Sequence, residues 1–249
     1  MGKRERIDKL LVERGLVRSR EEGHGRILAG DVLVDDQPIM KVGSFIDAGA
    51  FIRLRSERSP YVSRGGIKLE KALEGFKIDV SGRIVLDVGA STGGFTDCLL
   101  ARGARQIYAV DVGYGQLDWK LRNDPHVIVL EKTNIRYIEP SALAVPPDLV
   151  TIDVSFISLR LVLPQATKLA APEGEVVALI KPQFEVGRGK VGKGGVVRSR
   201  QEHLRVIEEI KDFAVGLRYR VQGTMESPLL GPKGNREFFI HLKHSHSCA

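Results

Sequence analysis

A short apolar segment followed by glycines and a helical pattern constrains the fold of this chain more than any other feature. Residues 84–88 (Ile-Val-Leu-Asp-Val) form a nearly continuous apolar run, as in parallel strands that are buried on both faces. Gly89, Gly93 and Gly94 follow, and they allow a sharp turn and the close approach of a ligand. Residues 95–100 then have the pattern of a helix, whose first N–H groups are unpaired. Strand, glycine turn and helix together predict a nucleotide-type binding site.

The spacing of these glycines narrows the choice of ligand. Gly-x-x-x-Gly-Gly is neither the dinucleotide fingerprint nor a Walker A loop, which needs Gly-Lys followed by Ser or Thr. A second apolar strand pattern over residues 107–110 ends in Asp111, which lies 22 residues after Gly89 (111 − 89), where an acid binds a ribose diol. Asp87 is placed to approach a cationic methionine-type ligand. The pattern favours S-adenosylmethionine (SAM) as cofactor, and a tight turn without a ligand is the alternative.

Composition excludes several classes of protein. The chain has 249 residues, 43% of them hydrophobic and 28% charged, which fits a main globular domain plus a small module. No apolar run approaches the ~20 residues of a membrane span, and the basic N-terminus lacks a signal-peptide core. Cys98 and Cys248 form neither a metal motif nor a disulfide framework, so we expect a protein of the reducing cytoplasm. The lack of a long apolar run predicts no membrane contact. The net charge of +7 suits a polyanionic partner but does not prove one.

Strand and helix patterns alternate through the rest of the chain. Residues 127–130, 149–153 and 176–182 predict three further buried strands, and residues 159–169 and 202–215 predict helices. This alternation predicts an α/β fold with a doubly wound, mostly parallel sheet.

Two polar residues after these strands complete the predicted cofactor site. Asn134 follows the third strand and is placed to meet an adenine edge, and Asp153 ends the fourth. The predicted cofactor-binding residues are Asp87, Gly89, Ala90, Ser91, Thr92, Gly93, Gly94, Phe95, Asp111, Asn134 and Asp153.

The N-terminal residues predict a small α+β domain. An apolar stripe at residues 7–11 indicates a helix, and residues 19–22 (Ser-Arg-Glu-Glu) form a capping box that opens a second helix. Residues 32–34 and 51–54 have strand patterns, with a predicted turn at residues 35–38.

This small domain resembles the S4 RNA-binding domain. The resemblance rests on Arg6-Ile7-Asp8, Leu11, Gly15, Ser19-Arg20, Ile27, Gly30 and Val32-x-Val34. Gly23 departs from the family, where alanine is usual, and together with Gly25 it weakens the second helix. The resemblance implies RNA binding, and a small domain without an RNA role is the alternative. The candidate RNA contacts here are Arg6, Arg14, Arg18, Ser19, Arg20 and Arg26.

The predicted S4-like domain is residues 1–58, and a polar linker at residues 59–64 joins it to a catalytic domain at residues 65–249. Between residues 181 and 205 the chain has seven basic and two acidic side chains, together with five glycines. Such a segment fits a loop over a phosphate backbone or, equally well, a solvated surface loop. The candidate RNA contacts outside the small domain are Arg64, Arg188, Lys190, Lys193 and Arg198.

Four ionisable residues stand at the ends of predicted elements. Lys68 lies in the first turns of a predicted helix, and Asp153 and Lys181 each end a strand. Ligands of open parallel sheets bind at the carboxyl ends of the strands. If the last strand pattern, residues 237–242, runs antiparallel, Glu237 reaches that same edge. Each residue alone fits a surface charge, but together they form a candidate active site.

The four residues resemble the Lys-Asp-Lys-Glu set of the RrmJ/FtsJ-like ribose 2′-O-methyltransferases. Longer motifs resemble the TlyA branch of that family, which carries an S4 domain ahead of the catalytic domain: residues 181–185, 192–198 and 231–238. The resemblance implies a Rossmann-like methyltransferase with a mostly parallel seven-stranded sheet. It also implies SAM-dependent 2′-O-methylation of ribosomal RNA, on cytidine in 16S or 23S rRNA. Members of this family have also been labelled hemolysins.

The implied reaction suits these residue types. A ribose 2′-hydroxyl is a weak nucleophile and must lose its proton as it attacks the methyl group in line. We expect Lys181 to accept or steer that proton, with Lys68 and Asp153 as its first partners and Glu237 orienting the substrate. A like charge on Lys68 would favour the neutral amine of Lys181. The methyl donor is a sulfonium, so no metal is required, and alignment supplies much of the rate.

Other functions are weighed against this prediction. Enzymes that methylate base amines carry Asn/Asp-Pro-Pro-Tyr after the fourth strand, where this chain has Asp153-Val154-Ser155-Phe156. Cytosine C5 chemistry needs a cysteine nucleophile, and Cys98 is expected on the helix after the glycine loop. A non-catalytic RNA-binding or ribosome-assembly protein and a membrane-active hemolysin remain as alternatives. The expected partners are ribosomal RNA or ribosomal subunits, with no obligate protein partner.

Overall fold

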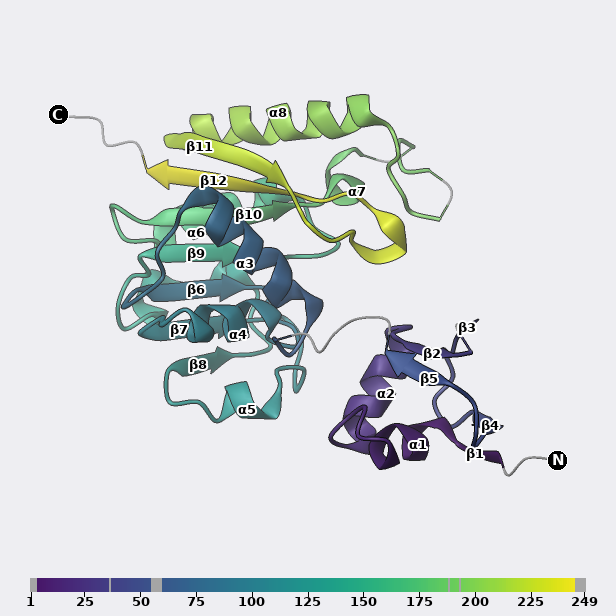
Figure 1. Cartoon of the computed structure of the whole chain (residues 1–249). Coiled ribbons are helices and arrows are strands. Elements are labelled where there is room, and N and C mark those ends of the chain that lie inside the picture. Colours follow the sequence, from purple (N-terminus) through teal and green to yellow (C-terminus); the bar gives the residue numbers. More distant parts are fainter. Residues whose placement is uncertain (1–3, 36, 55–59, 188, 193, 245–249) are drawn as a thin grey trace. The chain divides into compact units, whose positions relative to one another are not determined.

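The chain forms two compact units that divide after residue 59. The computed structural model describes residues 4–35, 37–54, 60–187, 189–192 and 194–244. Each unit has its own hydrophobic core. Figure 1 shows the helices and strands of both units.

The small unit packs two helices against short antiparallel strands. Its elements are β1 (Arg4–Arg6), α1 (Ile7–Glu13), α2 (Arg20–Leu28), β2 (Val32–Val34), β3 (Gln37–Pro38), β4 (Phe45–Asp47) and β5 (Ile52–Leu54). The predicted cap forms, because Ser19 Oγ accepts a hydrogen bond from the N–H of Glu22 at 3.2 Å. The Glu22 carboxylate accepts from the N–H of Arg18 at 2.8 Å, one residue before the expected position.

The predicted turn at residues 35–38 is partly wrong. The chain reverses at Asp35, which has a φ of +48°, but Gln37 and Pro38 already belong to strand β3. Pro38 pairs with Leu33 of β2, and β3 lies at the edge of a sheet with the order β3-β2-β5. Proline is tolerated at an edge because its missing N–H removes no hydrogen bond to a further strand.

A buried carboxylate, Asp8, organises the basic side chains of the small unit. Asp8 has 0% of its side chain exposed and pairs with Arg6 Nε at 3.0 Å and Arg20 Nη2 at 2.7 Å. His24 Nε2 lies 3.0 Å from the same carboxylate. Hydrogen bonding to Arg6 holds the pKa of Asp8 well below its usual range. Two candidate RNA contacts, Arg6 and Arg20, are therefore fixed from beneath while remaining half exposed.

We predict that Asp8→Ala destabilises the small unit by about 1–3 kcal/mol, because both arginines lose a charged hydrogen-bond partner. The half-exposed guanidinium groups can be hydrated, which keeps the loss below that of a fully buried pair. Hydrogen exchange of residues 4–54 measures the change. Glu13→Ala is the control, because it removes only a surface pair with Lys9 at 3.2 Å and is expected to cost less than about 0.5 kcal/mol. Equal losses for both variants would contradict the anchoring role of Asp8.

The large unit is built on a seven-stranded sheet with the order β11-β12-β10-β9-β6-β7-β8. The strands are β6 (Ile84–Val88), β7 (Gln106–Val110), β8 (Val127–Leu130), β9 (Leu149–Ile152), β10 (Glu175–Ile180), β11 (Tyr219–Glu226) and β12 (Phe238–His244). Strands β10, β9, β6, β7 and β8 are parallel, and β12 runs antiparallel to both of its neighbours. The predicted α/β class and mostly parallel sheet are confirmed.

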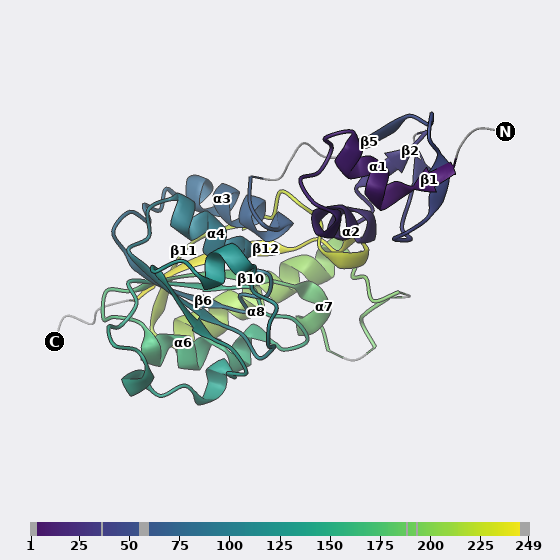
Figure 2. The same ribbon diagram turned by 90° about the horizontal axis from the view of Figure 1, so that it is seen from below.

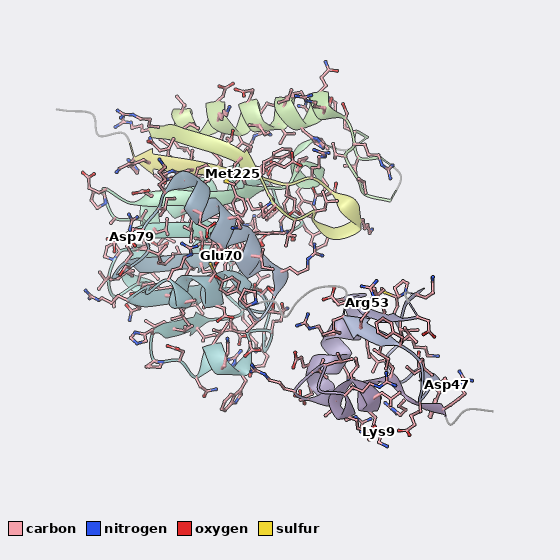
Figure 3. The ribbon with its side chains drawn as sticks, in the orientation of Figure 1. Lys9, Asp47, Arg53, Glu70, Asp79 and Met225 are labelled. Carbon is pink, nitrogen blue, oxygen red and sulfur yellow. The ribbon has the colours of Figure 1, made fainter. Side chains whose placement is uncertain are left out.

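Helices cover both faces of this sheet (Figure 2). α3 (Arg64–Phe76) and α4 (Gly94–Ala101) lie on one face, and α6 (Leu163–Leu169) and α8 (Arg200–Gly216) lie on the other. The alternation of side chains along β10 serves both layers, because Val177 packs with the α3 side and Ala178 with the α8 side. The sulfur of Met225 on β11, a residue labelled in Figure 3, packs against Gly75 of α3. A Cβ added at Gly75 would lie 2.8 Å from this sulfur.

Shorter helical segments fill the connections. They are α5 (Trp119–Arg122), α7 (Pro182–Glu185) and 3₁₀ turns at Ile135–Tyr137, Pro140–Ala142, Leu159–Leu161 and Pro232–Gly234. The predicted continuous helix at residues 159–169 is therefore wrong: a 3₁₀ turn comes first and α6 starts at Leu163. Pro164 explains the break, because proline is accommodated in the first turn of a helix but not in its interior.

Residues 61–63 of the predicted linker pack on the large unit. Tyr61 Oη donates to Glu70 of α3 at 2.8 Å, and the N–H of Val62 donates to Asp97 of α4 at 2.8 Å. Ser63 Oγ caps α3 by accepting from the N–H of Gly65 at 3.3 Å. No helix within the described parts of the chain combines the length and apolar character that crossing a membrane requires.

Candidate active site

The predicted site residues follow strand ends that meet at one edge of the sheet. Gly89, Asp111 and Asp153 come directly after β6, β7 and β9, and Lys181 comes after β10. Because β12 is antiparallel to β10, the pairing of Ile180 with Phe238 brings Glu237 beside Lys181 at this edge. The condition on which the placement of Glu237 depended, an antiparallel last strand, is therefore met.

The glycine loop after β6 packs tightly against the end of β9. Gly89 has a φ of +86°, and a Cβ there would lie 2.5 Å from the carbonyl oxygen of Asp153. Only glycine meets both conditions, the left-handed backbone and the close approach. The Asp111 carboxylate accepts hydrogen bonds from the N–H of Ser91 at 2.8 Å and of Gly113 at 2.7 Å. One acid thus ties the glycine loop to the segment that follows β7.

Two cavities open at this edge and share a wall. The first, which we call the Asp111 cavity, has a volume of about 460 Å³. Its lining includes Gly89, Ser91, Asp111, Gln116, Thr133, Asn134 and Asp153, with apolar surface from Val88, Val110, Val112, Ile135 and Val154. Apolar walls with a few convergent polar groups are typical of a small-molecule site.

The second cavity, the Lys181 cavity, has a volume of about 280 Å³. It is lined by Lys68, Lys181, Arg64, Leu230 and Gly231, together with the loop residues Ala90, Thr92, Gly94 and Phe95. Gly89, Ser91, Asp153 and Ser155 line both cavities. A ligand in either cavity therefore contacts the same loop and the same carboxylate.

The four ionisable residues form two separate ion pairs. Lys68 Nζ donates to Glu237 Oε2 at 2.6 Å, and Lys181 Nζ lies 2.6 Å from Asp153 Oδ1. Lys181 also donates to Ser155 Oγ at 2.9 Å. Both lysines are nearly buried, each with 8% of its surface exposed. The expected partnership of Lys181 with Asp153 is present, but Lys68 contacts Glu237, a residue we expected to orient the substrate.

Glu237 is held in a tight environment. It is 1% exposed, and a Cβ on Gly231 would lie 2.0 Å from its Oε1. Within the described residues, Oε1 has no hydrogen-bond partner. Glu237 lines neither cavity, so this oxygen is a buried acceptor behind Gly231, which itself lines the Lys181 cavity.

Two of the predicted cofactor contacts line neither cavity. Gly93 faces Leu117 and Leu121, and a Cβ there would lie 2.2 Å from Leu121. Asp87 is 0% exposed and accepts hydrogen bonds from Thr96 Oγ1 at 2.7 Å and Thr151 Oγ1 at 3.0 Å. Gly93 therefore packs the glycine loop against Leu117 and Leu121, and Asp87 joins β6 to α4 and β9 through its two hydrogen bonds.

The burial of Asp87 predicts a pH-dependent stability. Burial raises the pKa of Asp87 from its ordinary value of 3.8 to about 6. The folded state then binds this proton more tightly than the unfolded chain, so the contribution of Asp87 to folding is favourable at low pH and is lost as the pH rises through 6. Asp87→Asn carries no such charge. Relative to the wild type, we expect the variant to gain about 1–1.5 kcal/mol between pH 5 and pH 8, since about one pH unit of this window lies below the raised pKa.

Urea unfolding of both proteins at pH 5 and pH 8 measures this gain. If the unfolding free energies of Asp87→Asn and the wild type differ by the same amount at both pH values, the result contradicts a raised pKa of Asp87. Because Asp87 lies outside both cavities, the dissociation constant of SAM is expected to change little. A large loss of SAM affinity in a folded variant would instead support direct contact with the cofactor.

The predicted RNA contacts in the large unit lie in different settings. Arg64 lines the Lys181 cavity and donates to the carbonyl of Leu230 at 3.3 Å. Lys190 pairs with Glu202 of α8 at 3.2 Å, and Arg198 is exposed. Arg188 and Lys193 lie outside the described residues.

In the small unit, the remaining predicted RNA contacts are partly engaged. Arg14 donates to the carbonyls of Ala48 at 2.6 Å and Ala50 at 2.7 Å. Arg26 pairs with Asp31 at 3.6 Å, and Arg18 is exposed.

Sequence analysis missed several residues that the structure places at the site, among them Ser155, Phe156 and Gly231. Ser155 and Gly231 line the Lys181 cavity, whereas Phe156, which is 91% exposed and has a φ of +64°, lines the Asp111 cavity. The Phe156 ring lies 5.1 Å from the ring of Phe184, which follows Lys181. The signal was present in the segment Asp153-Val154-Ser155-Phe156, which we compared only with a different motif.

Cys98, the residue considered for a nucleophile, is excluded from the site by its position on α4. It is fully buried, and burial raises the pKa of its thiol to about 12. A buried thiol that stays protonated is a poor nucleophile.

Comparison with known proteins agrees with this geometry. Residues 61–244 match the family described as FtsJ-like methyltransferase. The chain belongs to the FtsJ-like methyltransferase family. The family predicted from the Lys-Asp-Lys-Glu set and the longer motifs is thus confirmed, and the chain is a methyltransferase.

Relatives of this FtsJ-like methyltransferase match it over nearly the whole chain. It is 48% identical over 244 residues to the 16S/23S rRNA (cytidine-2′-O)-methyltransferase TlyA of Mycobacterium tuberculosis (strain ATCC 25618 / H37Rv), covering 98% of this chain and 91% of that protein. It is 38% identical over 238 residues to Hemolysin A of Brachyspira hyodysenteriae, covering 95% of this chain and 99% of that protein. The solved structure of a Streptococcus thermophilus protein is similar with a TM-score of 0.79 at 45% identity, covering 99% of this chain and 90% of that one.

Proposed function

We propose that this FtsJ-like methyltransferase transfers a methyl group from SAM to the 2′-hydroxyl of a cytidine in ribosomal RNA. The observation that carries the proposal is the wall shared by the two cavities, where Asp153 meets Lys181 at 2.6 Å. A cofactor on one side and a substrate on the other would meet at this ion pair. The names of the TlyA relatives supply the nucleoside and the class of RNA.

The residues of the Asp111 cavity fit SAM. Asp111 and Asn134 are placed for the ribose diol and the adenine edge, and apolar side chains such as Val110 and Ile135 offer a surface for the ring. Ser91 and Asp153 also line the Lys181 cavity, so a cofactor bound here would reach the wall that the two cavities share. When bound, SAM supplies an electrophilic methyl group on a sulfonium.

The Lys181 cavity fits a ribose whose hydroxyl must lose a proton. Lys181 accepts or steers this proton, and Asp153 and Ser155 hold its amine in position. Glu237 would orient the substrate indirectly, through Lys68 and Gly231, which both contact this carboxylate and line the Lys181 cavity. Alignment of the hydroxyl with the methyl group then supplies much of the rate.

Recognition of RNA is proposed for the basic residues of both units. Arg6 and Arg20, fixed by Asp8, would contact phosphates of structured RNA, as the resemblance to an S4 domain implies. Arg64 borders the Lys181 cavity and would contact the backbone near the target. Phe156 offers an exposed ring on which an unstacked base can pack. Ribosomal RNA as substrate implies a cytoplasmic enzyme.

Transfer of labelled methyl groups from SAM to purified small and large ribosomal subunits tests the proposal. Label in ribosomal RNA is the expected result, and the labelled subunit identifies the target. SAM binding without transfer to subunits or to naked ribosomal RNA would favour a non-catalytic RNA-binding protein. The name Hemolysin A of one relative motivates a second assay, release of dye from liposomes by detergent-free protein, for which we expect no activity.

A further inference from the structure

The basic loop (residues 187–199, described except for 188 and 193) is joined to the loop that carries Glu237. Both segments contain long motifs whose role the two ion pairs leave unexplained. We propose that Asn235 is a positioning residue that couples RNA binding at the basic loop to the Lys68–Glu237 pair. The inference rests on the proposed function, because it assumes that RNA is the substrate.

The side-chain amide of Asn235 bonds the basic loop at two points. Its Oδ1 accepts from the N–H of Val197 at 3.0 Å, and its Nδ2 donates to the carbonyl of Gly195 at 3.0 Å. Asn235 is 3% exposed, so these bonds are shielded from water. An amide that donates and accepts at once selects asparagine here, because an aspartate would place a carboxylate oxygen against the Gly195 carbonyl.

The backbone of Asn235 shapes the pocket around Glu237. The carbonyl of Asn235 accepts from the N–H of Gly231 at 2.8 Å, and Gly231 is the residue packed against Glu237 Oε1. Glu237 itself follows two residues later, and its carbonyl accepts from the N–H of Ser227 at 2.8 Å. A shift of Asn235 therefore moves both Gly231 and Glu237, and Glu237 moves Lys68.

The basic loop is held firmly enough at its base to transmit such a shift. Val196 and Val197 are buried, with 7% and 3% of their surface exposed. His203 Nε2 of α8 lies 2.8 Å from the carbonyl oxygen of Val197. Gly192 and Val196 form an isolated β-bridge. Arg198 is exposed and available to phosphates, and Lys190 is exposed but would exchange its pair with Glu202 at 3.2 Å for a phosphate contact.

The coupling predicts two effects for Asn235→Ala. Without the amide, Val197 and Gly195 at the base of the basic loop lose their hydrogen bonds to the Glu237 loop, so RNA binds less tightly. The carboxylate of Glu237 also loses its fixed position, which is expected to lower the single-turnover rate at saturating RNA about tenfold or more. The SAM dissociation constant is expected to stay within about twofold, because Asn235 lines neither cavity.

A double-mutant cycle with Glu237→Gln separates positioning from a general structural defect. If Asn235 acts through Glu237, Asn235→Ala lowers the rate about tenfold in the wild type but less than about twofold in the Glu237→Gln protein. The same fold-loss in both backgrounds, or weaker RNA binding with an unchanged rate, would overturn the proposal. Asn123→Ala is the matched control, because this exposed asparagine bonds only its own turn through the carbonyl of Trp119 at 2.7 Å.

Hydrogen exchange provides a readout that does not depend on methyl transfer. Asn235→Ala is expected to speed exchange at residues 194–198 and also at residues 229–238, because the two loops lose a common anchor. Faster exchange in the first segment alone would overturn the coupling. Should Asn235→Ala fail to fold, Asn235→Ser keeps a neutral side chain that can donate and accept, and it tests the same pattern. If Asn235→Ala speeds exchange in both segments but the wild-type protein methylates no ribosomal RNA, the proposed function fails and only the anchoring of one loop on the other stands.

Discussion

Replacing Lys181 with methionine is expected to lower methyl transfer to ribosomal RNA by about 10²–10⁴-fold, the range that a positioned proton-transfer group contributes. Methionine keeps the length and apolar stem of lysine but removes the amine that contacts Asp153 at 2.6 Å and Ser155 at 2.9 Å. Single-turnover kinetics with saturating SAM and RNA measures the loss directly. SAM binding by titration calorimetry is expected to remain, because Lys181 lines only the Lys181 cavity.

The matched control for this variant is Lys71→Met. Lys71 lies on α3 and pairs with Glu74 at 2.8 Å on the protein surface, so its loss is expected to leave the rate within about twofold. Wild-type rates in a folded Lys181→Met protein would contradict a role for Lys181 in the reaction. Loss of SAM binding together with activity would instead indicate that the substitution damages the shared wall.

Gly89→Ala is expected to weaken SAM binding by roughly 10- to 100-fold, which corresponds to about 1–3 kcal/mol of overpacking. The added methyl group would lie 2.5 Å from the carbonyl oxygen of Asp153, so the glycine loop and the end of β9 must move apart. Both border the Asp111 cavity, and a shift of either changes its shape. Calorimetric titration of the variant with SAM measures the effect.

Gly82→Ala separates this clash from backbone strain. Gly82 has a φ of +73°, close to the +86° of Gly89, but a Cβ at Gly82 would meet no atom within 4 Å. Both variants therefore share a left-handed strain of about 1–2 kcal/mol in stability, and only Gly89→Ala is expected to lose SAM affinity. Equal SAM affinities in the two variants would contradict the close packing of the glycine loop on β9.

The strands of the large unit and the edge at which they meet are predictable from the sequence because buried parallel strands read as apolar runs. The run at residues 84–88 and the acid Asp111 each indicate a strand end, and parallel strands place their ends together. The antiparallel course of β12 was a condition of the prediction, and the pairing of Ile180 with Phe238 meets it.

The pairing of charges within the site could not be predicted from the sequence. Lys68 and Glu237 are 169 residues apart and meet only because α3 packs beside the start of β12. Sequence spacing does not report such a contact, since it depends on how helix and sheet are packed. Asp87 illustrates a related limit: its position next to the glycine loop suggested a ligand contact, but its side chain points to Thr96 and Thr151 inside the protein.

Contacts between loops are a further limit. Asn235 reaches Val197 across 38 residues, and both belong to glycine-containing segments without periodic patterns. Periodic patterns of apolar residues predict helices and strands, because they reflect which side chains are buried. A buried amide between two loops depends instead on the backbone course of both loops. The long motifs marked these segments as unusual, and the structure shows what joins them.

Chemical analysis of the methylated product tests the central claim most directly. Ribosomal RNA labelled by the enzyme is digested to nucleosides and resolved by mass spectrometry, and a portion is treated with alkali. We predict a cytidine with its methyl group on the ribose and a neighbouring phosphodiester bond that resists alkaline cleavage, because the 2′-oxygen no longer attacks. A methyl group on the base, with normal alkaline cleavage, would contradict the assignment of Lys181 and Asp153 to a ribose hydroxyl.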